Sequence, residues 1–250
     1  MIITHISDTH GQEQYFDMKK FPLSDVVVHS GDFTTFGYRH EVVKFIEFAR
    51  KLISLGKCKY FVFTAGNHDR SFDSKYSHEY KGERGTNKPD WLIEVLSELK
   101  HTNIYYLENS GIEIEGVKFW GSPVTPWFHG ERWAFNRYRG DNIDEVWKRI
   151  PFDTDVLITH GPPSYKHDFT VRTQEYVGCE NLRFRVKEIK PLLHCFGHIH
   201  EGYGCSYDED TLYSNGSQCT EYNSFVSRPL IYILNEETKT IRHFKEHLPF

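Results

Sequence analysis

Polar clusters of aspartate, asparagine and histidine follow separate apolar runs along the chain. These clusters are Asp8-Thr9-His10, Gly31-Asp32, Gly66-Asn67-His68-Asp69, Thr159-His160-Gly161 and Gly197-His198-Ile199-His200. Carboxylate and amide oxygens with imidazole nitrogens, and no thiolate, are the donors that hard and borderline divalent cations prefer. The pattern therefore indicates a divalent metal site assembled from distant segments.

The number of candidate donors favours two ions over one. The candidate ligands are Asp8, His10, Asp32, Asn67, His160, His198 and His200. A mononuclear zinc site uses about three or four ligands, whereas a catalytic pair of ions about 3.5 to 4 Å apart shares a bridging carboxylate. Glycine precedes three of the candidates, and we expect it to let the backbone turn sharply after a strand.

Apolar runs precede the clusters and predict the elements that position them. Strands are expected at 2–7, 25–30, 60–65, 104–107, 112–114, 117–120, 155–160 and 192–196, helices at 41–55, 91–99 and 182–189, and antiparallel strands at 211–214, 230–234 and 240–244. The segment 122–140 has no clean period and is expected to be a long loop. Because ligand sites gather beyond the carboxyl ends of strands in α/β sheets, the clusters should meet.

These elements predict an α/β fold with two packed sheets of mixed direction and helices on the outer faces, in one domain spanning residues 1–250. The 250 residues carry a net charge of -5, which argues against a broad polyanion-binding surface, so nucleic acid is a possible but not favoured partner. The chain offers no bilayer-spanning run and begins without a secretory signal. We therefore expect a cytoplasmic protein with no membrane partner.

The cysteines provide no sign of a disulfide framework. They are five in number, an odd count, and they are widely spaced with no CxxC pair. Free thiols in a reducing compartment are therefore expected.

The ordered set DxH, GD, GNHD, a later histidine after a strand, and GHxH resembles the signature of the calcineurin-like metallophosphoesterases. The resemblance extends from Ile3 to about Leu234 and implies a four-layer sandwich of two mixed β-sheets flanked by helices. Segments 121–128, 133–136, 159–163 and 196–204 also resemble the brain metallophosphoesterase-domain-containing proteins, which are linked to hydrolysis of cyclic nucleotides and model phosphodiesters.

The resemblance also implies residue roles. The first ion would be held by Asp8, His10 and His200, the second by Asn67, His160 and His198, with Asp32 as the bridge. His68 would act as a general acid or stabilise developing charge, with Asp69 orienting it or supporting the site. The ions would be manganese, iron, zinc, cobalt or nickel, with manganese favoured for activity, and a bridging hydroxide would attack phosphorus.

The aromatic segment 122–140 has two interpretations. As a cap over the site, it would offer Trp127, Phe128, Asn136 and Arg137 as substrate contacts. Alternatively, it is a packed surface flap or an oligomer contact, since aromatic residues are also favoured there.

The leading functional hypothesis is hydrolysis of small phosphodiesters or phosphomonoesters, with cyclic nucleotides or nucleotide-like esters first. The alternatives are a nuclease acting on polynucleotide ends, a protein phosphatase, and a scaffold without metal or catalysis. A scaffold should have a broken ligand set, whereas every motif position here holds a competent donor. The oligomeric state is open at this stage.

Overall fold

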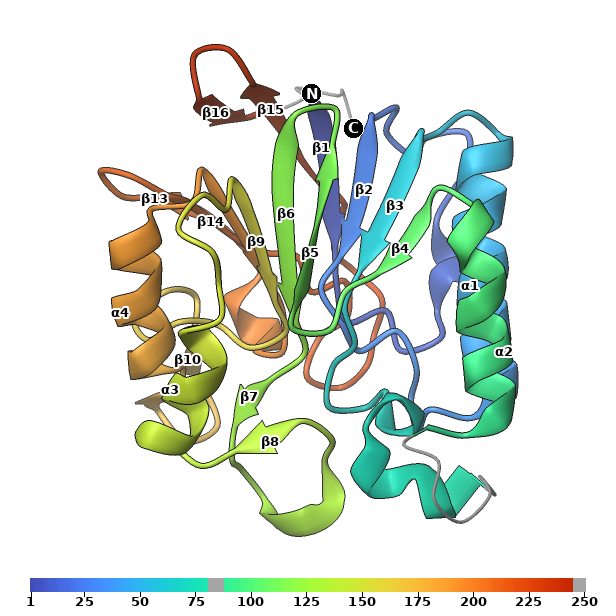
Figure 1. Ribbon diagram of the computed structural model, residues 1–250, viewed down its shortest axis with the longest axis horizontal. Helices are drawn as coiled ribbons and strands as arrows, with labels where there is room; N and C mark the ends of the chain where they lie inside the picture. The colour runs from blue at the N-terminus through green and yellow to red at the C-terminus, as the bar shows by residue number, and fades with distance from the viewer. Residues whose placement is uncertain (81–87, 245–250) are drawn as a thin grey trace.

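The computed structural model describes residues 1–80 and 88–244. Two six-stranded sheets pack face to face, with helices on their outer surfaces (Figure 1). The four-layer α/β sandwich expected from the sequence is therefore confirmed. Among the described helices, none has the length and apolar character needed to cross a bilayer.

The first sheet has the order β16-β15-β1-β2-β3-β4. Its strands are β1 (Ile2–Ile6), β2 (Val26–His29), β3 (Tyr60–Phe63), β4 (Ile104–Tyr106), β15 (Leu230–Asn235) and β16 (Thr240–His243). Strands β1, β2, β3 and β4 run parallel, whereas β15 is antiparallel to β1 and β16 is antiparallel to β15. Helices α1 (Arg39–Ser54) and α2 (Asp90–Glu98) cover its outer face (Figure 1).

The second sheet has the order β13-β14-β12-β9-β6-β5. Its strands are β5 (Ser110–Ile114), β6 (Val117–Ser122), β9 (Val156–Thr159), β12 (Leu193–Phe196), β13 (Gly204–Tyr207) and β14 (Leu212–Asn215). Strands β6, β9, β12 and β14 are parallel, and β5 and β13 form antiparallel edges. Helices α3 (Asp141–Trp147) and α4 (Glu180–Ile189) cover its outer face (Figure 1).

Alternating side chains of the strands supply three apolar layers. In β2, Val26 and Val28 join the core between the sheets, while Val27 packs into the layer beneath α1. In β9, Ile158 faces the core between the sheets and Leu157 the layer that contains residues of α3 and α4. Strands buried on both faces appear as continuous apolar runs, which explains their strong sequence signal.

Short elements complete the described chain. They are η1 (Glu13–Tyr15), η2 (Arg70–Phe72), η3 (Ser74–Tyr80), η4 (Leu99–His101), η5 (Gly130–Arg132), η6 (His200–Gly202), β7 (Thr125–Pro126), β8 (Asn136–Arg137), β10 (Phe169–Thr170) and β11 (Glu175–Tyr176). Figure 1 shows β7 and β8 at the end of the molecule opposite the N-terminus.

Three sequence expectations need correction. The loop expected at 122–140 contains the paired strands β7 and β8 and the turn η5. The expected antiparallel tail is divided between the sheets, because β14 pairs in parallel with β12 while β15 joins β1. Helix α3 was not predicted because it is only seven residues long. Strand β13 was not predicted because it is an edge strand with little buried surface.

Candidate metal centre

The carboxyl ends of strands from both sheets converge on one site. Strands β1, β2 and β3 deliver the first three polar clusters, and β9 and β12 deliver the last two. A parallel bridge between Ser7 and Ser217 joins the segments that follow β1 and β14, so the sheets meet at this end. The convergence follows from parallel pairing, which aligns the strand ends.

Possible metal ligands form a continuous chain of three groups. The groups are Asp8, His10 and His200; His10, Asp32 and His68; and Asp32, His160 and His198. Within each group, one ligand atom per residue lies within 4.8 Å of the others. Because His10 and Asp32 each belong to two groups, the donors form one continuous cluster rather than separate sites.

Individual distances show how closely the donors approach. His200 Nε2 lies 3.4 Å from Asp8 Oδ1 and 3.4 Å from His10 Nε2. At the other end, His160 Nε2 lies 2.9 Å from the Asn67 side-chain oxygen and 3.4 Å from Asp32 Oδ2. The asparagine therefore presents its oxygen, the atom that could ligate a cation.

Backbone carbonyls orient the candidate imidazoles. Nδ1 of His160 donates to the carbonyl of Ser30 at 3.0 Å, and Nδ1 of His200 donates to that of Thr220 at 2.8 Å. Because a carbonyl only accepts, Nδ1 carries the proton and Nε2 faces the cluster. This is the arrangement in which a neutral histidine ligates a metal, with its other nitrogen bonded to a carbonyl.

Several of the candidate ligands have a left-handed backbone. The φ angles are 50° for Asp8, 45° for His10, 56° for Asp32 and 68° for His198. Non-glycine residues rarely adopt this region, and such conformations concentrate at functional sites because the surrounding structure must maintain them.

Two of the three glycines before the ligands are needed because there is no room for a Cβ atom. This corrects the expectation that all three permit a sharp turn. Only Gly31 has a positive φ, of 108°, whereas Gly66 and Gly197 do not. A Cβ atom on Gly66 would lie 2.3 Å from Asp32 Oδ1, and one on Gly197 would lie 2.0 Å from Asp8 Oδ2. The ligand carboxylates therefore pack directly on these two glycines.

Burial and charge divide the histidines into two classes. Burial lowers the pKa of His160, but the Asp32 carboxylate outweighs it, and the pKa rises to about 9. The pKa of His200 also rises to about 9, since Asp8 outweighs its burial. Burial dominates at the other two histidines, lowering the pKa of His198 to about 3 and that of His10 to about 4. The cluster therefore pairs cationic imidazoles with carboxylates.

His68 lies at the edge of the cluster. Its ring contacts that of His10 with centroids 4.7 Å apart, and its backbone N–H donates to Asp32 Oδ1 at 2.8 Å. Nδ1 of His68 donates to the Thr35 carbonyl at 2.8 Å, so this carbonyl orients the ring. Asp69 forms its hydrogen bonds with backbone N–H groups and a threonine hydroxyl rather than with the His68 ring.

Asp69 holds the loops that carry the ligands. Its Oδ2 accepts from the backbone N–H groups of Asp32 at 2.9 Å and Gly66 at 2.7 Å. Its Oδ1 accepts from the N–H and hydroxyl of Thr34 at 2.9 and 2.7 Å. Burial and the neighbouring Asp32 raise the pKa of Asp69 to about 8. Of the two roles expected for Asp69, its contacts correspond to support of the site.

Ser217 is a contact of the cluster that sequence reasoning did not find. Its hydroxyl donates to Asp8 Oδ2 at 2.8 Å, and the backbone N–H of His198 donates to both Asp8 oxygens at 3.1 Å. A lone serine in a loop after β14 has no local signal that relates it to Asp8.

The aromatic segment touches the cluster through two rings. Phe128 contacts His198 with centroids 4.8 Å apart, and the ring of Trp133 contacts that of His68 with centroids 4.4 Å apart. Trp127 instead stacks on Tyr138. The structure thus brings one of the four predicted substrate contacts against a candidate ligand.

The other two predicted substrate contacts, Asn136 and Arg137, form hydrogen bonds within the segment 122–140. The Asn136 side chain accepts from the Thr125 hydroxyl at 3.0 Å and donates to the Phe128 carbonyl at 3.4 Å. Arg137 is exposed and donates to the Asn136 carbonyl at 3.4 Å. Asn136 therefore stabilises the loop that carries Phe128.

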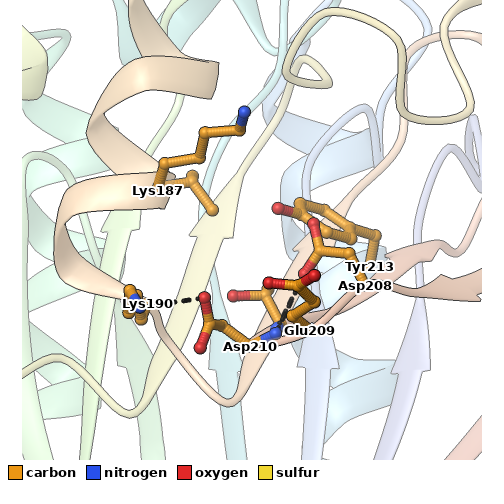
Figure 2. Close-up of a pocket in the computed structure, with 8 residues that line it drawn as sticks. Lys187, Lys190, Asp208, Glu209, Asp210 and Tyr213 are labelled. Atoms are coloured by element: carbon orange, nitrogen blue, oxygen red, sulfur yellow. Dashed lines mark hydrogen bonds and ion pairs between the residues drawn. The ribbon is translucent and has the colours of Figure 1, made fainter.

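A separate surface cavity of about 440 Å³ lies between α4 and the turn joining β13 to β14 (Figure 2). Its lining includes Lys187 of α4, Lys190 directly after α4 and three acidic residues of the turn, and Lys190 pairs with Asp210 at 3.0 Å. None of the seven predicted ligands lines this cavity. The cavity is therefore distinct from the candidate metal centre.

All five cysteines are free, as expected from their spacing. Four of them are buried, and none belongs to the donor groups of the cluster. The described donor set therefore consists of oxygen and nitrogen.

The fold and the site define a class of protein, the metal-dependent phosphoesterases with a two-sheet α/β sandwich. Residues 1–202 match a family model described as calcineurin-like phosphoesterase, and the chain belongs to that family.

Three relatives illustrate the similarity. The chain is 38% identical over 234 residues to human metallophosphoesterase domain-containing protein 1, covering 90% of this chain and 68% of the relative. It is 37% identical over 234 residues to the Caenorhabditis elegans UPF0046 protein K07C11.7, covering 93% of this chain and 75% of that protein. The crystal structure of TT1561 of Thermus thermophilus shares the fold, with a TM-score of 0.58 at 14% identity over 97% of both chains.

Proposed function

We propose that the cluster binds two divalent cations and hydrolyses small phosphate esters. The first ion is assigned to Asp8, His10 and His200, the second to Asn67, His160 and His198, and the bridge to Asp32. The observation that carries the proposal is the position of Asp32, whose carboxylate lies within 4.8 Å of a ring nitrogen of His10 in one group and of His160 and His198 in another. A carboxylate between two sets of donors is what a pair of ions requires.

The residues present fit such ions on chemical grounds. Carboxylate, amide oxygen and imidazole form the donor set, and the carbonyl contacts of Nδ1 leave Nε2 of His160 and His200 directed at the cluster. This donor set accepts manganese, iron, zinc, cobalt or nickel, so availability selects among them. We use Mn²⁺ in the experiments below.

Two bound cations would lower the pKa of a water molecule and neutralise charge on the phosphoryl oxygens. The role assigned to His68 is to donate a proton from Nε2 to the departing ester oxygen while Nδ1 remains bonded to the Thr35 carbonyl. That contact supports the assignment, because it fixes which nitrogen can face the substrate. Asp69 is assigned a positioning role, through its bonds to the backbone of Asp32 and Gly66.

The proposed substrates are small phosphodiesters or phosphomonoesters, with cyclic nucleotides or nucleotide-like esters first. Two observations support this choice over a polynucleotide. The chain has a net charge of -5, and Phe128 and Trp133 place aromatic rings beside the cluster. Aromatic rings bind bases of any sequence by stacking, whereas polynucleotide binding depends on extended cationic surface.

The test uses purified protein loaded with Mn²⁺ and bis(p-nitrophenyl) phosphate as the substrate. We expect turnover that a chelator abolishes and that added Mn²⁺ restores. Absence of turnover with each of the five candidate metals would contradict the proposed function and favour a scaffold.

Two variants separate metal binding from proton donation. His68→Ala should lower kcat by about 10²- to 10⁴-fold with metal content unchanged, since it removes only a general acid. Asp32→Ala should lose both turnover and bound metal. His101→Ala, on an exposed side chain, is the matched control and should behave as the unmodified protein. Full activity in either site variant would refute the corresponding assignment.

A further inference from the structure

Phe128 and Trp133 form a pair of aromatic rings across the candidate metal centre. Their planes are nearly parallel, at 14°, with centroids 6.2 Å apart. Phe128 lies against His198, at 4.8 Å, while Trp133 lies against His68, at 4.4 Å. The Phe128–Trp133 pair therefore reaches both a candidate ligand and the proposed proton donor.

Hydrogen bonds to the loop after β3 hold the pair in place. The backbone N–H of Ala134 donates to the Asn67 carbonyl at 3.1 Å, and the Tyr76 hydroxyl donates to the Trp133 carbonyl at 2.9 Å. Ala134 is fully buried, whereas the rings of Phe128 and Trp133 are only partly covered. A hydrogen-bonded backbone thus presents two partly exposed rings, which is the arrangement of a binding surface rather than of a packed core.

We propose that Trp133, together with Phe128, selects phosphate esters whose leaving group carries a planar ring, as an aryl alcohol does directly and a nucleoside does through its sugar. This inference rests on the proposed function. His68 is assigned to donate its proton to the departing oxygen, and Trp133 contacts the ring of His68. The group that carries that oxygen therefore lies beside Trp133, where a flat ring of that group can stack and a purely aliphatic group cannot.

Stacking recognises the plane of a ring rather than its hydrogen-bonding groups. The selection should therefore extend across different bases and simple aryl groups. Trp127 and Tyr138 stack on each other and are 42% and 63% exposed. They form a separate aromatic contact and are not part of the proposed selection.

The test measures binding of three phosphonates to Mn²⁺-loaded protein by isothermal titration calorimetry. Phenylphosphonate has a planar ring, cyclohexylphosphonate has similar bulk without a planar face, and methylphosphonate has neither. Hydrolysis does not cleave their P–C bonds, so affinity is measured without turnover. We expect phenylphosphonate to bind about tenfold more tightly than methylphosphonate, and cyclohexylphosphonate to show only part of this gain.

The variants locate the preference in the ring. Trp133→Leu should remove most of the discrimination between phenyl and cyclohexyl, and Trp133→Phe should keep it because it retains an aromatic face. Trp133→Phe also shows whether a loss in the leucine variant comes from the missing ring or from misfolding. Phe184→Leu, at a side chain 66% exposed on α4, is the control and should leave all three affinities unchanged.

Equal affinity for phenyl- and cyclohexylphosphonate in the unmodified protein would overturn the inference, as would unchanged discrimination in a folded Trp133→Leu variant. Its failure is distinguishable from that of the proposed function. Turnover of bis(p-nitrophenyl) phosphate without ring preference refutes the selection alone, whereas ring preference without turnover refutes hydrolysis alone.

Discussion

Substitution of Gly197 by alanine tests the physical link between glycine packing and metal binding. Gly197 precedes His198, and its backbone does not have a positive φ, so alanine can adopt the same conformation. A Cβ atom there would lie 2.0 Å from Asp8 Oδ2 and 2.2 Å from the Ser7 hydroxyl. Any effect must therefore come from steric displacement of the Asp8 carboxylate and the Ser7 side chain.

The size of the effect can be worked from these distances. Non-bonded heavy atoms settle at about 3.5 Å, so Asp8 Oδ2 must withdraw by more than about 1 Å. Metal–ligand distances tolerate deviations of about 0.2 Å. The carboxylate should therefore leave the ligand position, and we expect the affinity for the first ion to fall at least about 100-fold, equivalent to about 2.7 kcal/mol. Overpacking should also lower the free energy of unfolding by about 1 to 3 kcal/mol.

The assay is calorimetric titration of metal-free protein with Mn²⁺, together with metal analysis after dialysis. The unmodified protein should bind two ions per chain, and Gly197→Ala should keep only one tightly. Urea denaturation measures the accompanying loss of stability.

The control variant is Gly56→Ala. Nothing lies within 4 Å of a Cβ atom at Gly56, but its φ of +65° makes alanine unfavourable by about 1 to 2 kcal/mol. Gly56→Ala should therefore lose stability while keeping both ions. If Gly197→Ala binds two ions with unchanged affinity, the reasoning from packing is wrong.

Two further predictions concern pH. His160 and His200, whose pKa values are raised to about 9, are protonated at pH 7, so binding of Mn²⁺ should release up to about two protons and tighten as pH rises toward 9. Titration in buffers of different ionisation enthalpy measures this release, and a heat independent of buffer would contradict it. Burial lowers the pKa of His5 and of His194 to about 3, whereas unfolded histidine titrates near about 6.5. The unfolded chain takes up protons that the native protein excludes, so the contribution of these two histidines to stability should be full above about pH 6.5 and fall toward pH 3, by up to about 1.4 kcal/mol per pH unit for each histidine. Urea midpoints measured from about pH 6.5 to about pH 5, where His160 and His200 stay largely protonated in both states, test this, and a flat profile would refute it.

The strands that carry the site could be predicted because their signal is local. Fully buried strands such as β2 and β9 appear as short apolar runs, and each ends where a glycine or a polar residue begins. Their predicted limits agree with the structure to within one residue at each end. Helix α3 was missed because seven residues after Gly140 do not complete two turns of an amphipathic pattern.

The environment of the candidate ligands could not be predicted in the same way. The carbonyl of Thr220 orients His200 across 20 residues, and the hydroxyl of Ser217 reaches Asp8 across 209. Such contacts leave no periodic pattern in the sequence. The reason for glycine at position 197 also lies in a contact with Ser7 and Asp8, which follow β1, rather than in its own backbone.

The amino-acid sequence alone determined the layered α/β architecture and the donor types, because both follow from the order of apolar runs and the residues that end them. Only the tertiary structure decided how the donors are oriented, which aromatic rings lie beside them and where Asp69 bonds. These features depend on side chains and carbonyl groups from separate segments, and their positions are set only when both sheets pack together.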